Sequence, residues 1–270
     1  LLDRSKKPLR LTAAGDAFLG DLEPPLAALR QAMANANPGA MQFGRQLRLG
    51  TIEDFEARVV PDLAVFLNRE LPTLDFEYHI EPSLKLQEMI QNRTLDMSIM
   101  AKPSQLIPGV SYKPLLRDPF VLAVPKACAE NAEHLLGGQS EMPFLRFHGS
   151  QMIAQHIEAQ LQRMKVRLRK RMMVGNNAIM MALVAAGAGW AVTTPLLFAR
   201  SRYSHEDIRL LEFPKQDFAR EVGLFWSSDC PLQIAGKVQS KLTELIKAFA
   251  LDPVHEAYPW LRDRYTASIK

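Results

Sequence analysis

Polar side chains suited to anion binding follow short apolar segments at several points of this 270-residue sequence. Ser83 follows Pro82 where a helix is expected to begin, so free backbone N–H groups and the helix dipole would favour an anion there. Lys102 could balance the charge of such an anion. His148 and Ser150 precede another expected helix, and the histidine could tune affinity near neutral pH. This pattern predicts non-covalent binding of a small anion.

Each of these residues also has a structural interpretation. Ser83 could be an ordinary N-cap, and so could Asn176 or Asn177 at a later helix start. Lys102 could be an exposed, solvated side chain, and a lone histidine such as His148 is more often structural than functional. The residue types alone leave both interpretations open.

Strand-like and helical segments alternate between residues 46 and 250. Strands are expected at 46–50, 73–80, 95–100, 112–116, 120–124, 144–148, 168–174, 190–193, about 209–213 and 221–226, and helices at 55–67, 83–91, 151–164, 177–186 and 231–250. Strands interleaved with helices imply parallel sheets, and two such sets imply two α/β lobes. Such sheets bind ligands outside the carboxyl ends of their strands, so the site should lie between the lobes. Thr51 and Thr194 each follow a strand and join the candidate residues.

The first forty residues have a different pattern. Thr12 can cap a helix, and one apolar stripe follows it at helical spacing. Such a stripe predicts packing on another subunit. Pro24 and Pro25 predict a kink or two short helices, and residues 35–39 predict a linker. The residues of the dimerisation stripe are Phe18, Leu22, Leu26, Leu29 and Met33.

Basic residues are concentrated in two short segments of a chain whose formal net charge is +4. The first spans residues 1–10 and the second, residues 163–171, contains no acid. Clustered cations could bind nucleic-acid phosphates. Val166 and Leu168 alternate with the basic residues, however, which favours a charged strand at a sheet edge.

Several classes of protein lack support in this sequence. No apolar run approaches the ~18 residues of a membrane-spanning helix, and Cys128 and Cys230 stand alone. The motifs G-x-S-x-G, HExxH and Walker A are absent, and the six histidines are scattered. Met172, Met173, Met180 and Met181 are expected in the core. We therefore expect a cytoplasmic protein that is not an enzyme and has no metal, cofactor or membrane partner.

Four stretches resemble the LysR-type transcriptional regulators. Residues 1–15, with Leu1-Leu2-Asp3-Arg4 and then Pro8 to Gly15, are similar to the end of the winged helix-turn-helix, with Leu2 in place of the usual Phe. Residues 47–50, 95–99 and 186–190 are similar to segments of the effector-binding domain. The resemblance covers roughly residues 1–250, and its N-terminal motif is the most specific part.

The resemblance implies a fold and a division of the chain. The fold is α/β, a two-lobed periplasmic-binding-protein-like effector domain preceded by a linker helix. Residues 1–42 would form the end of the wing and the dimerising linker helix. Residues 43–250 would form the effector-binding domain, with lobe I at about 43–123 and 226–250 and lobe II at about 124–225. Residues 251–270 would be a C-terminal extension.

The resemblance also implies how the chain would work. The helix-turn-helix should precede Leu1, so the basic end of the wing would contact DNA phosphates without reading bases. The chain would be the effector-binding and oligomerisation portion of a regulator, which senses a carboxylate-bearing metabolite as a homodimer or homotetramer. A two-lobed solute-binding protein without a regulatory role is the alternative, and a catalytic cleft is third. The effector-binding residues would be Thr51, Ser83, Lys102, His148, Ser150 and Thr194, and the phosphate contacts Arg4, Lys6, Lys7 and Arg10.

Overall fold

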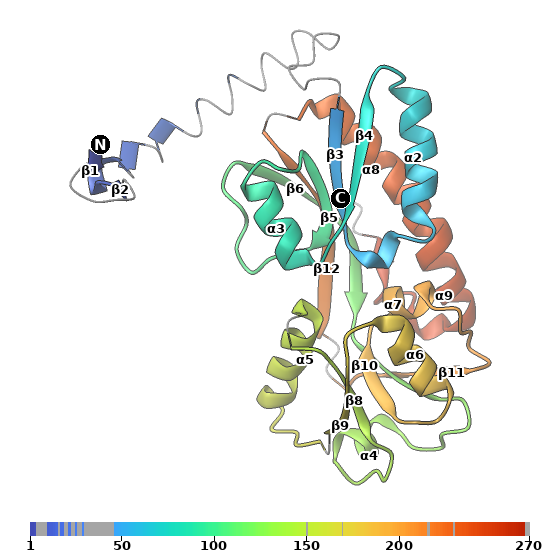
Figure 1. The fold of residues 1–270 in the computed structure, drawn as a ribbon. Helices are drawn as coiled ribbons and strands as arrows, with labels where there is room; N and C mark the ends of the chain where they lie inside the picture. Colours follow the sequence, from blue (N-terminus) through green and yellow to red (C-terminus); the bar gives the residue numbers. More distant parts are fainter. Residues whose placement is uncertain are drawn as a thin grey trace.

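The computed structural model describes residues 1–3, 10–15, 17–18, 21–22, 25, 29, 46–149, 151–168, 170–214, 217–228 and 230–267. From residue 46 onward the chain forms two α/β lobes stacked end to end (Figure 1). Each lobe contains its own sheet with helices packed against it. This architecture confirms the two-lobed α/β fold expected from the sequence.

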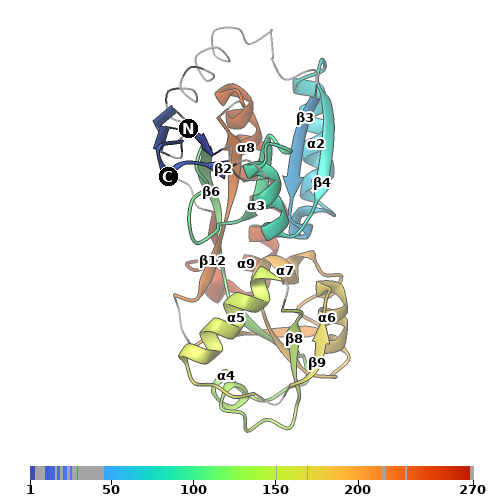
Figure 2. The same ribbon diagram turned by 60° about the vertical axis from the view of Figure 1, so that its left-hand side comes forward.

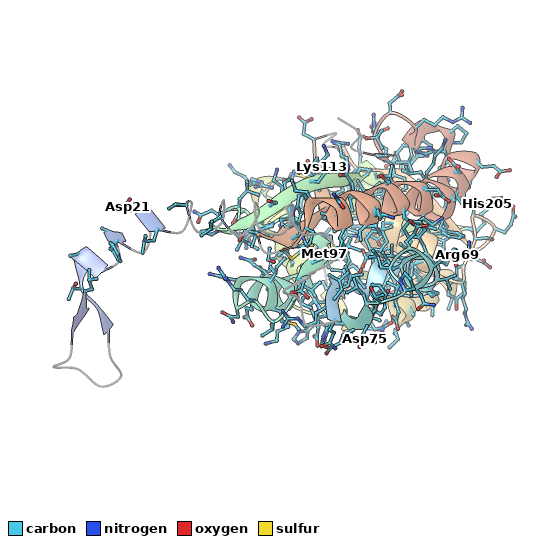
Figure 3. The ribbon with its side chains drawn as sticks, turned by 90° about the horizontal axis from the view of Figure 1, so that it is seen from above. Asp21, Arg69, Asp75, Met97, Lys113 and His205 are labelled. Carbon is cyan, nitrogen blue, oxygen red and sulfur yellow. The ribbon has the colours of Figure 1, made fainter. Side chains whose placement is uncertain are left out.

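Lobe I, at the top of Figure 1, has a six-stranded sheet in the order β13-β6-β12-β5-β3-β4. Strand β3 pairs in parallel with β4 and β5, whereas β12 runs antiparallel to β5 and β6. Seen from above, Met97 lies in the middle of this lobe and Arg69, Asp75 and Lys113 lie around it (Figure 3). The strands are β3 (Gln46–Thr51), β4 (Asp75–Ile80), β5 (Met97–Ala101), β6 (Val110–Pro119), β12 (Ala219–Ser227) and β13 (Thr266–Ala267), and the main helices are α2 (Val59–Glu70), α3 (Ser83–Gln91) and α8 (Leu232–Ile246).

Lobe II has a five-stranded sheet in the order β11-β7-β10-β8-β9. Strand β8 pairs in parallel with β9 and β10, whereas β7 runs antiparallel to β10 and β11. The strands are β7 (Val121–Pro125), β8 (Phe144–Phe147), β9 (Lys170–Val174), β10 (Trp190–Thr193) and β11 (Ile208–Glu212). The helices are α4 (Ala132–Leu136), α5 (Met152–Arg163), α6 (Asn177–Ala185) and α7 (Pro195–Arg200).

Both sheets are mixed, so the expectation of parallel sheets was wrong for three of the five strand pairings in lobe I and two of the four in lobe II. The chain leaves lobe I along β6 and returns along β12, and these neighbouring strands must therefore run in opposite directions. In lobe II, the chain enters along β7 and leaves along β11, so these two neighbouring strands are also antiparallel. Strand β12 begins at Ala219, earlier than the boundary at residue 226 expected from the sequence.

The two connections between the lobes lie side by side. The amide of Phe120 donates a hydrogen bond to the carbonyl of Phe218 at 2.9 Å. Their rings stack with centroids 3.9 Å apart and an interplanar angle of 9°. Phe213 packs against Phe218 at 5.0 Å. This aromatic group lies where the chain passes between the lobes.

Most differences from the expected elements have local causes. The helix expected from residue 55 begins at Val59, because Glu53–Phe55 forms a separate 3-10 turn, η1, and Pro61 is tolerated in the first turn of α2. Helix α8 is followed by a π-helical turn, η2 (Lys247–Leu251), α9 (Asp252–Ala257) and the 3-10 turn η3 (Pro259–Leu261). Helices α4, α7 and α9 and strand β13 were not expected, since each is too short for a periodic pattern.

The N-terminal expectations are only partly within the described residues. Strands β1 (Leu2–Asp3) and β2 (Arg10–Leu11) pair antiparallel, and the Gly15 amide donates to Thr12 Oγ1 at 3.1 Å, which confirms Thr12 as a cap. Phe18 and Leu29 are exposed and Leu22 partly so. The dimerisation and phosphate-contact roles stay predictions. Leu26, Met33, Arg4, Lys6 and Lys7 lie outside the described residues, as does the side chain of Arg10.

The second basic segment is not a single strand. Arg163 ends α5 and Lys165 adopts a positive φ of 56° in the following turn, so the strand begins only at Lys170. Strand β9 is an edge strand, as expected. Met180 and Met181 are fully buried, but Met173 is 57% exposed, and the expectation that it lies in the core was wrong. Met173 lies on an edge strand, which has a neighbouring strand on one side only.

Two glycines after α6 have different structural reasons. Gly187 has a φ of +76°, a conformation that ends the helix and that L side chains rarely adopt. A Cβ at Gly189 would overlap the Pro143 carbonyl oxygen and would lie 2.8 Å from the Leu145 side chain. Strand β10 can therefore approach β8 closely because residue 189 lacks a side chain.

We expect Gly189→Ala to lower the free energy of unfolding by about 1–3 kcal/mol, because a methyl group would overlap the Pro143 carbonyl oxygen and crowd the Leu145 side chain. The matched control is Gly236→Ala in α8, where nothing lies within 4 Å of the added Cβ. There the greater helix propensity of alanine should raise stability by about 0.5–1 kcal/mol. Urea denaturation measures both variants, and equal effects would show that the space around residue 189 does not require glycine.

Candidate functional site

Three predicted site residues meet at one edge of the lobe I sheet. Thr51 ends β3 and Lys102 follows β5, and these strands are parallel neighbours. Ser83 begins α3, and its Oγ accepts a hydrogen bond from the Ala101 amide at 3.2 Å. The structure thus brings Thr51, Ser83 and Lys102 together at the carboxyl ends of the parallel strands.

Two more predicted residues lie at the corresponding edge of lobe II. His148 follows β8 and Thr194 follows β10, again parallel neighbours. His148 is exposed, whereas Thr194 is fully buried. Ser150 lies outside the described residues.

These two edges face each other. Arg220, at the start of β12 in lobe I, donates from Nη2 to Thr194 Oγ1 at 3.2 Å. The next residue, Glu221, accepts a backbone hydrogen bond from Lys102 at 2.8 Å. The carboxyl ends of the parallel strands of both lobes are therefore directed toward the junction (Figure 2).

The hydroxyl groups at this junction differ in what they can offer. Ser83 is the first residue of α3 and makes no capping bond, so its N-cap interpretation was wrong. Because Ser83 Oγ accepts from Ala101, its O–H remains a donor for another group. Thr51 is fully buried, and its hydroxyl donates to the Ile52 carbonyl at 3.3 Å. Ser83 is therefore better placed than Thr51 to donate to a ligand.

Lys102 already has an anionic neighbour. Its Nζ lies 2.9 Å from Glu221 Oε1 and 5.1 Å from the centroid of the Tyr112 ring. The Tyr112 hydroxyl donates to the same carboxylate. Burial and then Glu221 raise the pKa of Tyr112 above its usual range. An anionic ligand at Lys102 would have to share the ammonium group with Glu221.

The strongest polar cluster at the junction involves residues that the sequence patterns did not reveal. Arg220 donates from Nε to Asp118 Oδ2 at 2.8 Å and from Nη2 to Asp54 Oδ2 at 2.5 Å. The amide of Leu196, in the first turn of α7, donates to Asp118 Oδ1 at 3.1 Å. Together with Thr194, this Arg220 cluster joins η1, β6 and β12 of lobe I to α7 of lobe II.

Burial sets the electrostatics of the Arg220 cluster. The side chains of Arg220 and Asp54 are at most one-tenth exposed and that of Asp118 is fully buried. Burial alone would lower the pKa of the Arg220 guanidinium, but the carboxylates of Asp54 and Asp118 raise it above its usual range. Burial raises the pKa of Asp118, while Arg220, the Thr194 hydroxyl and the Leu196 amide stabilise its carboxylate and oppose that shift. Charges that are buried in this way must stay paired.

The side chains of Arg200 and Asn176 make further contacts across the junction. Arg200 of α7 lies 2.5 Å from Glu53 Oε1 and 3.5 Å from Glu56 Oε2. Asn176 caps α6 by accepting from the Ala178 amide at 2.7 Å, which confirms its interpretation as a cap, and its Nδ2 lies 3.4 Å from Glu53 Oε1.

A sequence signal for these residues did exist. Asp118 lies two residues before Phe120 and Arg220 two residues after Phe218, in strands whose neighbouring residues are partly apolar. A charged residue in a buried strand requires a partner. The sequence does not say which of the many oppositely charged residues that partner is.

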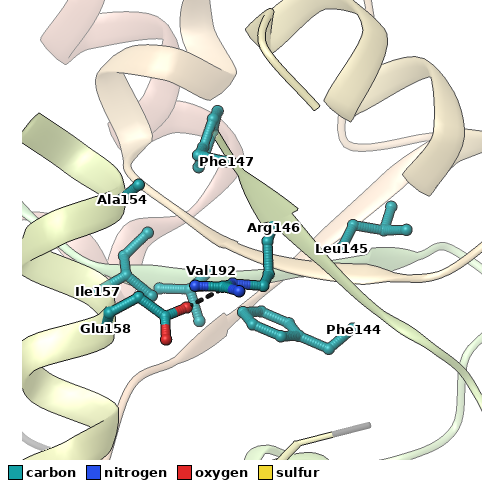
Figure 4. Close-up of a pocket in the computed structure, with 8 residues that line it drawn as sticks. All are labelled: Phe144, Leu145, Arg146, Phe147, Ala154, Ile157, Glu158 and Val192. Atoms are coloured by element: carbon teal, nitrogen blue, oxygen red, sulfur yellow. Dashed lines mark ion pairs between the residues drawn. The ribbon is translucent and has the colours of Figure 1, made fainter. Parts of the chain in front are cut away.

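The cavities of lobe II differ in size. A small cavity between α5 and the sheet holds ≈ 10 Å³ and is flanked by the ion pair of Arg146 with Glu158 at 2.7 Å (Figure 4). That volume suits at most a water molecule. A hollow of ≈ 420 Å³ lies between α5 and the connection to β12, and His156, Gln160, Arg163 and Phe218 are among its lining residues. This hollow is large enough for a small organic ligand.

Within the described residues, no group of three or more His, Cys, Asp and Glu side chains could hold a metal ion. No helix among those residues is both long and apolar enough to cross a membrane.

Comparisons with known proteins identify the family. The model of the LysR substrate binding domain matches residues 41–237, which is most of the chain. The chain belongs to the LysR family. A probable hydrogen peroxide-inducible genes activator of Streptomyces viridosporus is 29% identical over 143 residues, covering 53% of this chain and 44% of the relative. The Hca operon transcriptional activator HcaR of Escherichia coli is 29% identical over 157 residues, covering 57% and 49%. The chain thus spans about half the length of these relatives.

Solved structures share the fold of this LysR-family chain. A hydrogen peroxide-bound mutant of OxyR from Corynebacterium glutamicum superposes with a TM-score of 0.62 at 18% identity, covering 96% of this chain and 83% of that one. The effector binding domain of a BenM variant superposes with a TM-score of 0.61 at 11% identity, covering 76% and 95%. Both likenesses support the two-lobed fold of a LysR-type effector domain.

We expect Arg220→Met to lower the free energy of unfolding by about 3–5 kcal/mol, because it leaves Asp54 and Asp118 buried without a cation. Arg58→Met is the matched control, since Arg58 is exposed and the change should stay within about 0.5 kcal/mol. Urea denaturation at neutral pH compares the two variants. A loss below ~1 kcal/mol for Arg220→Met would show that the cluster is not a stabilising tie.

His156 gives a test by pH. Burial and the charges of Arg220 and Arg163 lower its pKa. The unfolded chain therefore binds this proton at a higher pH than the folded chain, and stability should fall as the pH drops below about 6.5. Thermal melts between about pH 8 and about pH 5 should show a shallower loss for His156→Gln than for the parent chain. The control His205→Gln, at an exposed site, should keep the parent slope, and identical slopes for both variants would refute the assignment.

Proposed function

We propose that this chain is the effector-binding portion of a LysR-type transcriptional regulator, in which a small carboxylate binds between the lobes and alters their relative orientation. The observation that carries the proposal is that the carboxyl edges of the two sheets face each other in a chain of this family. Ligands of α/β sheets bind at such edges. A ligand changes the relative orientation of the lobes only if it binds one orientation more tightly than the other.

The groups at the junction support an anionic ligand. Ser83 offers a hydroxyl proton and the free amides at the start of α3, where the helix dipole favours negative charge. Lys102 supplies a cation that Glu221 compensates in the absence of ligand. A carboxylate that binds Ser83 would compete with Glu221 for Lys102. The loss of that ion pair would affect β12 at the residue next to Arg220. Thr51, His148, Ser150 and Thr194 remain proposed members of the site.

The same proposal assigns a role to each segment of the chain and to the whole regulator. Residues 1–42 end a DNA-binding wing and form a dimerising helix, residues 43–250 bind the effector, and residues 251–270 extend the domain. The regulator acts in the cytoplasm as a homodimer or homotetramer on DNA, and it has no catalytic activity. A solute-binding protein of the same fold is the alternative, and it would bind ligand without any effect on DNA binding.

The cysteines argue against a disulfide switch within this chain. Cys128 lies beyond the end of β7 that points away from lobe I, and Cys230 follows the end of β12 that points away from lobe II. Because they lie at opposite ends of the molecule, a bond between them would require the lobes to be rearranged.

A thermal-shift panel tests the proposal. We would use benzoate, succinate and gluconate, each with its uncharged amide as a matched control. A dose-dependent rise in melting temperature with one acid and not with its amide is expected, since the site is built for an anion. No shift with any acid would contradict the carboxylate proposal.

Ser83→Ala should weaken an acid found in this way by roughly 1–2 kcal/mol, or about 5- to 30-fold in Kd, the loss of one charge-assisted hydrogen bond. Isothermal titration measures the affinity. Ser83→Ala also removes the acceptor of the Ala101 amide, so its melting temperature without ligand must be measured separately. The matched control is Ser111→Ala, an exposed serine near the opposite end of the lobe I sheet. Unchanged affinity in Ser83→Ala would remove Ser83 from the site.

A further inference from the structure

The end of the chain forms an ordered structure beyond the family match, which stops at residue 237. Helix α9, the turn η3 and strand β13 follow α8 within residues 252–267, a segment named here the C-terminal clasp. Its side chains Val254, Tyr258, Leu261 and Tyr265 are buried. A segment that buries this many apolar groups is an integral part of the fold.

The clasp is attached to lobe I through backbone contacts. Strand β13 pairs antiparallel with β6, with Thr266 opposite Arg117 and Ala267 opposite Leu116. Arg117 Nη1 donates to the Arg264 carbonyl at 2.8 Å. The clasp therefore forms the edge of the lobe I sheet, next to the strand that leads into lobe II.

The same segment also contacts lobe II through side chains. The Tyr258 hydroxyl donates to the Ile208 carbonyl in β11 at 2.8 Å. The Tyr258 ring meets Phe198 of α7 edge to face, with centroids 5.7 Å apart. Arg264 forms an ion pair with Glu212 at the end of β11. The clasp thus spans the junction, as the position of α9 beside α7 and α8 shows (Figure 1).

Tyr265 of the clasp is within the electrostatic influence of the Arg220 cluster. Its side chain is fully buried, and burial raises the pKa of its hydroxyl well above the usual range, with a further contribution from the nearby Asp118 carboxylate. Arg220 and Asp54 also act on this hydroxyl through their charges. A displacement of the clasp would therefore change the surroundings of the charges that join the two lobes.

We propose that the C-terminal clasp restrains the relative orientation of the lobes and thereby sets how far a ligand can shift it. Lobe I anchors the clasp by backbone pairing, and lobe II is held through Tyr258 and Arg264. Releasing the lobe II contacts leaves the anchor in place and allows the lobes to sample a wider range of orientations. The part that concerns ligand response depends on the proposed effector function; the restraint itself does not.

Distances between two spin labels test the restraint in the unliganded chain. Labels are attached at Asn68→Cys on α2 and Gln162→Cys on α5, both exposed positions, with Cys128→Ser to remove the partly exposed thiol. The release variant combines Tyr258→Phe, which removes only the hydroxyl, with Arg264→Glu, which opposes Glu212. We expect the interlobe distance distribution to broaden by roughly twofold.

Two controls make the result specific. Adding Glu212→Arg restores an ion pair of reversed polarity and should narrow the distribution again. Lys237→Glu reverses an ion pair with Glu70 that lies within lobe I, and it should leave the distribution unchanged. If circular dichroism shows that the release variant is unfolded, the distance distribution is measured in the single variant Arg264→Glu instead. This variant is expected to fold because the Arg264 side chain is partly exposed. A folded variant with the parent distribution would overturn the proposal.

The ligand arm uses benzoate, or whichever panel acid raises the melting temperature. In the release variant, the ligand should change the distance between the labels by more than it does in the parent chain. Ser83 is unchanged in this variant, so its contact with the ligand is kept. If no acid binds either protein, the effector proposal fails while the distance distributions still decide on the clasp.

Discussion

The pairing of the Arg220 guanidinium with two buried carboxylates is the constraint on which the arrangement of the lobes depends. Arg220 and Asp118 lie on the two strands that connect the lobes, and Asp54 follows the first strand of lobe I. Thr194 caps α7 of lobe II, and the Leu196 amide lies in the first turn of that helix. None of these groups can remain unpaired in the low-dielectric interior without a large penalty. The lobes therefore share one electrostatic centre, placed beside the stacked rings of Phe120 and Phe218.

In the proposed function, this position would couple ligand binding to the relative orientation of the lobes. Lys102 and Glu221 lie at the lobe I edge of the junction, and Glu221 is the chain neighbour of Arg220. A ligand that alters the Lys102–Glu221 pair acts on the same strand that holds the Arg220 cluster. Because the two connections are joined by a backbone hydrogen bond and by stacked rings, the lobes can rotate about them more easily than they can separate.

The C-terminal segment adds a further set of contacts on the side of β11 and α7. Surface ion pairs such as Arg264–Glu212 contribute little by themselves. Here that pair accompanies a buried tyrosine, a strand pairing and an edge-to-face ring contact, all within one short segment. Contacts across the junction thus come from the Arg220 cluster, from Arg200 with Glu53 and from the clasp, and the proposed ligand would have to work against their sum.

Local patterns in the sequence determined the two-lobed α/β class, the order of most strands and helices, the strand-end positions of Thr51 and Lys102 and the helix-start position of Ser83, because periodicity and helix starts depend on neighbouring residues. Partners distant in sequence were decided only by the tertiary structure. How the chain crosses twice between the lobes decides which acids surround Arg220. It also decides that Ser83 binds the Ala101 amide instead of capping α3, and that the last residues complete the lobe I sheet. A charge reveals that it needs a partner, but the fold selects which one.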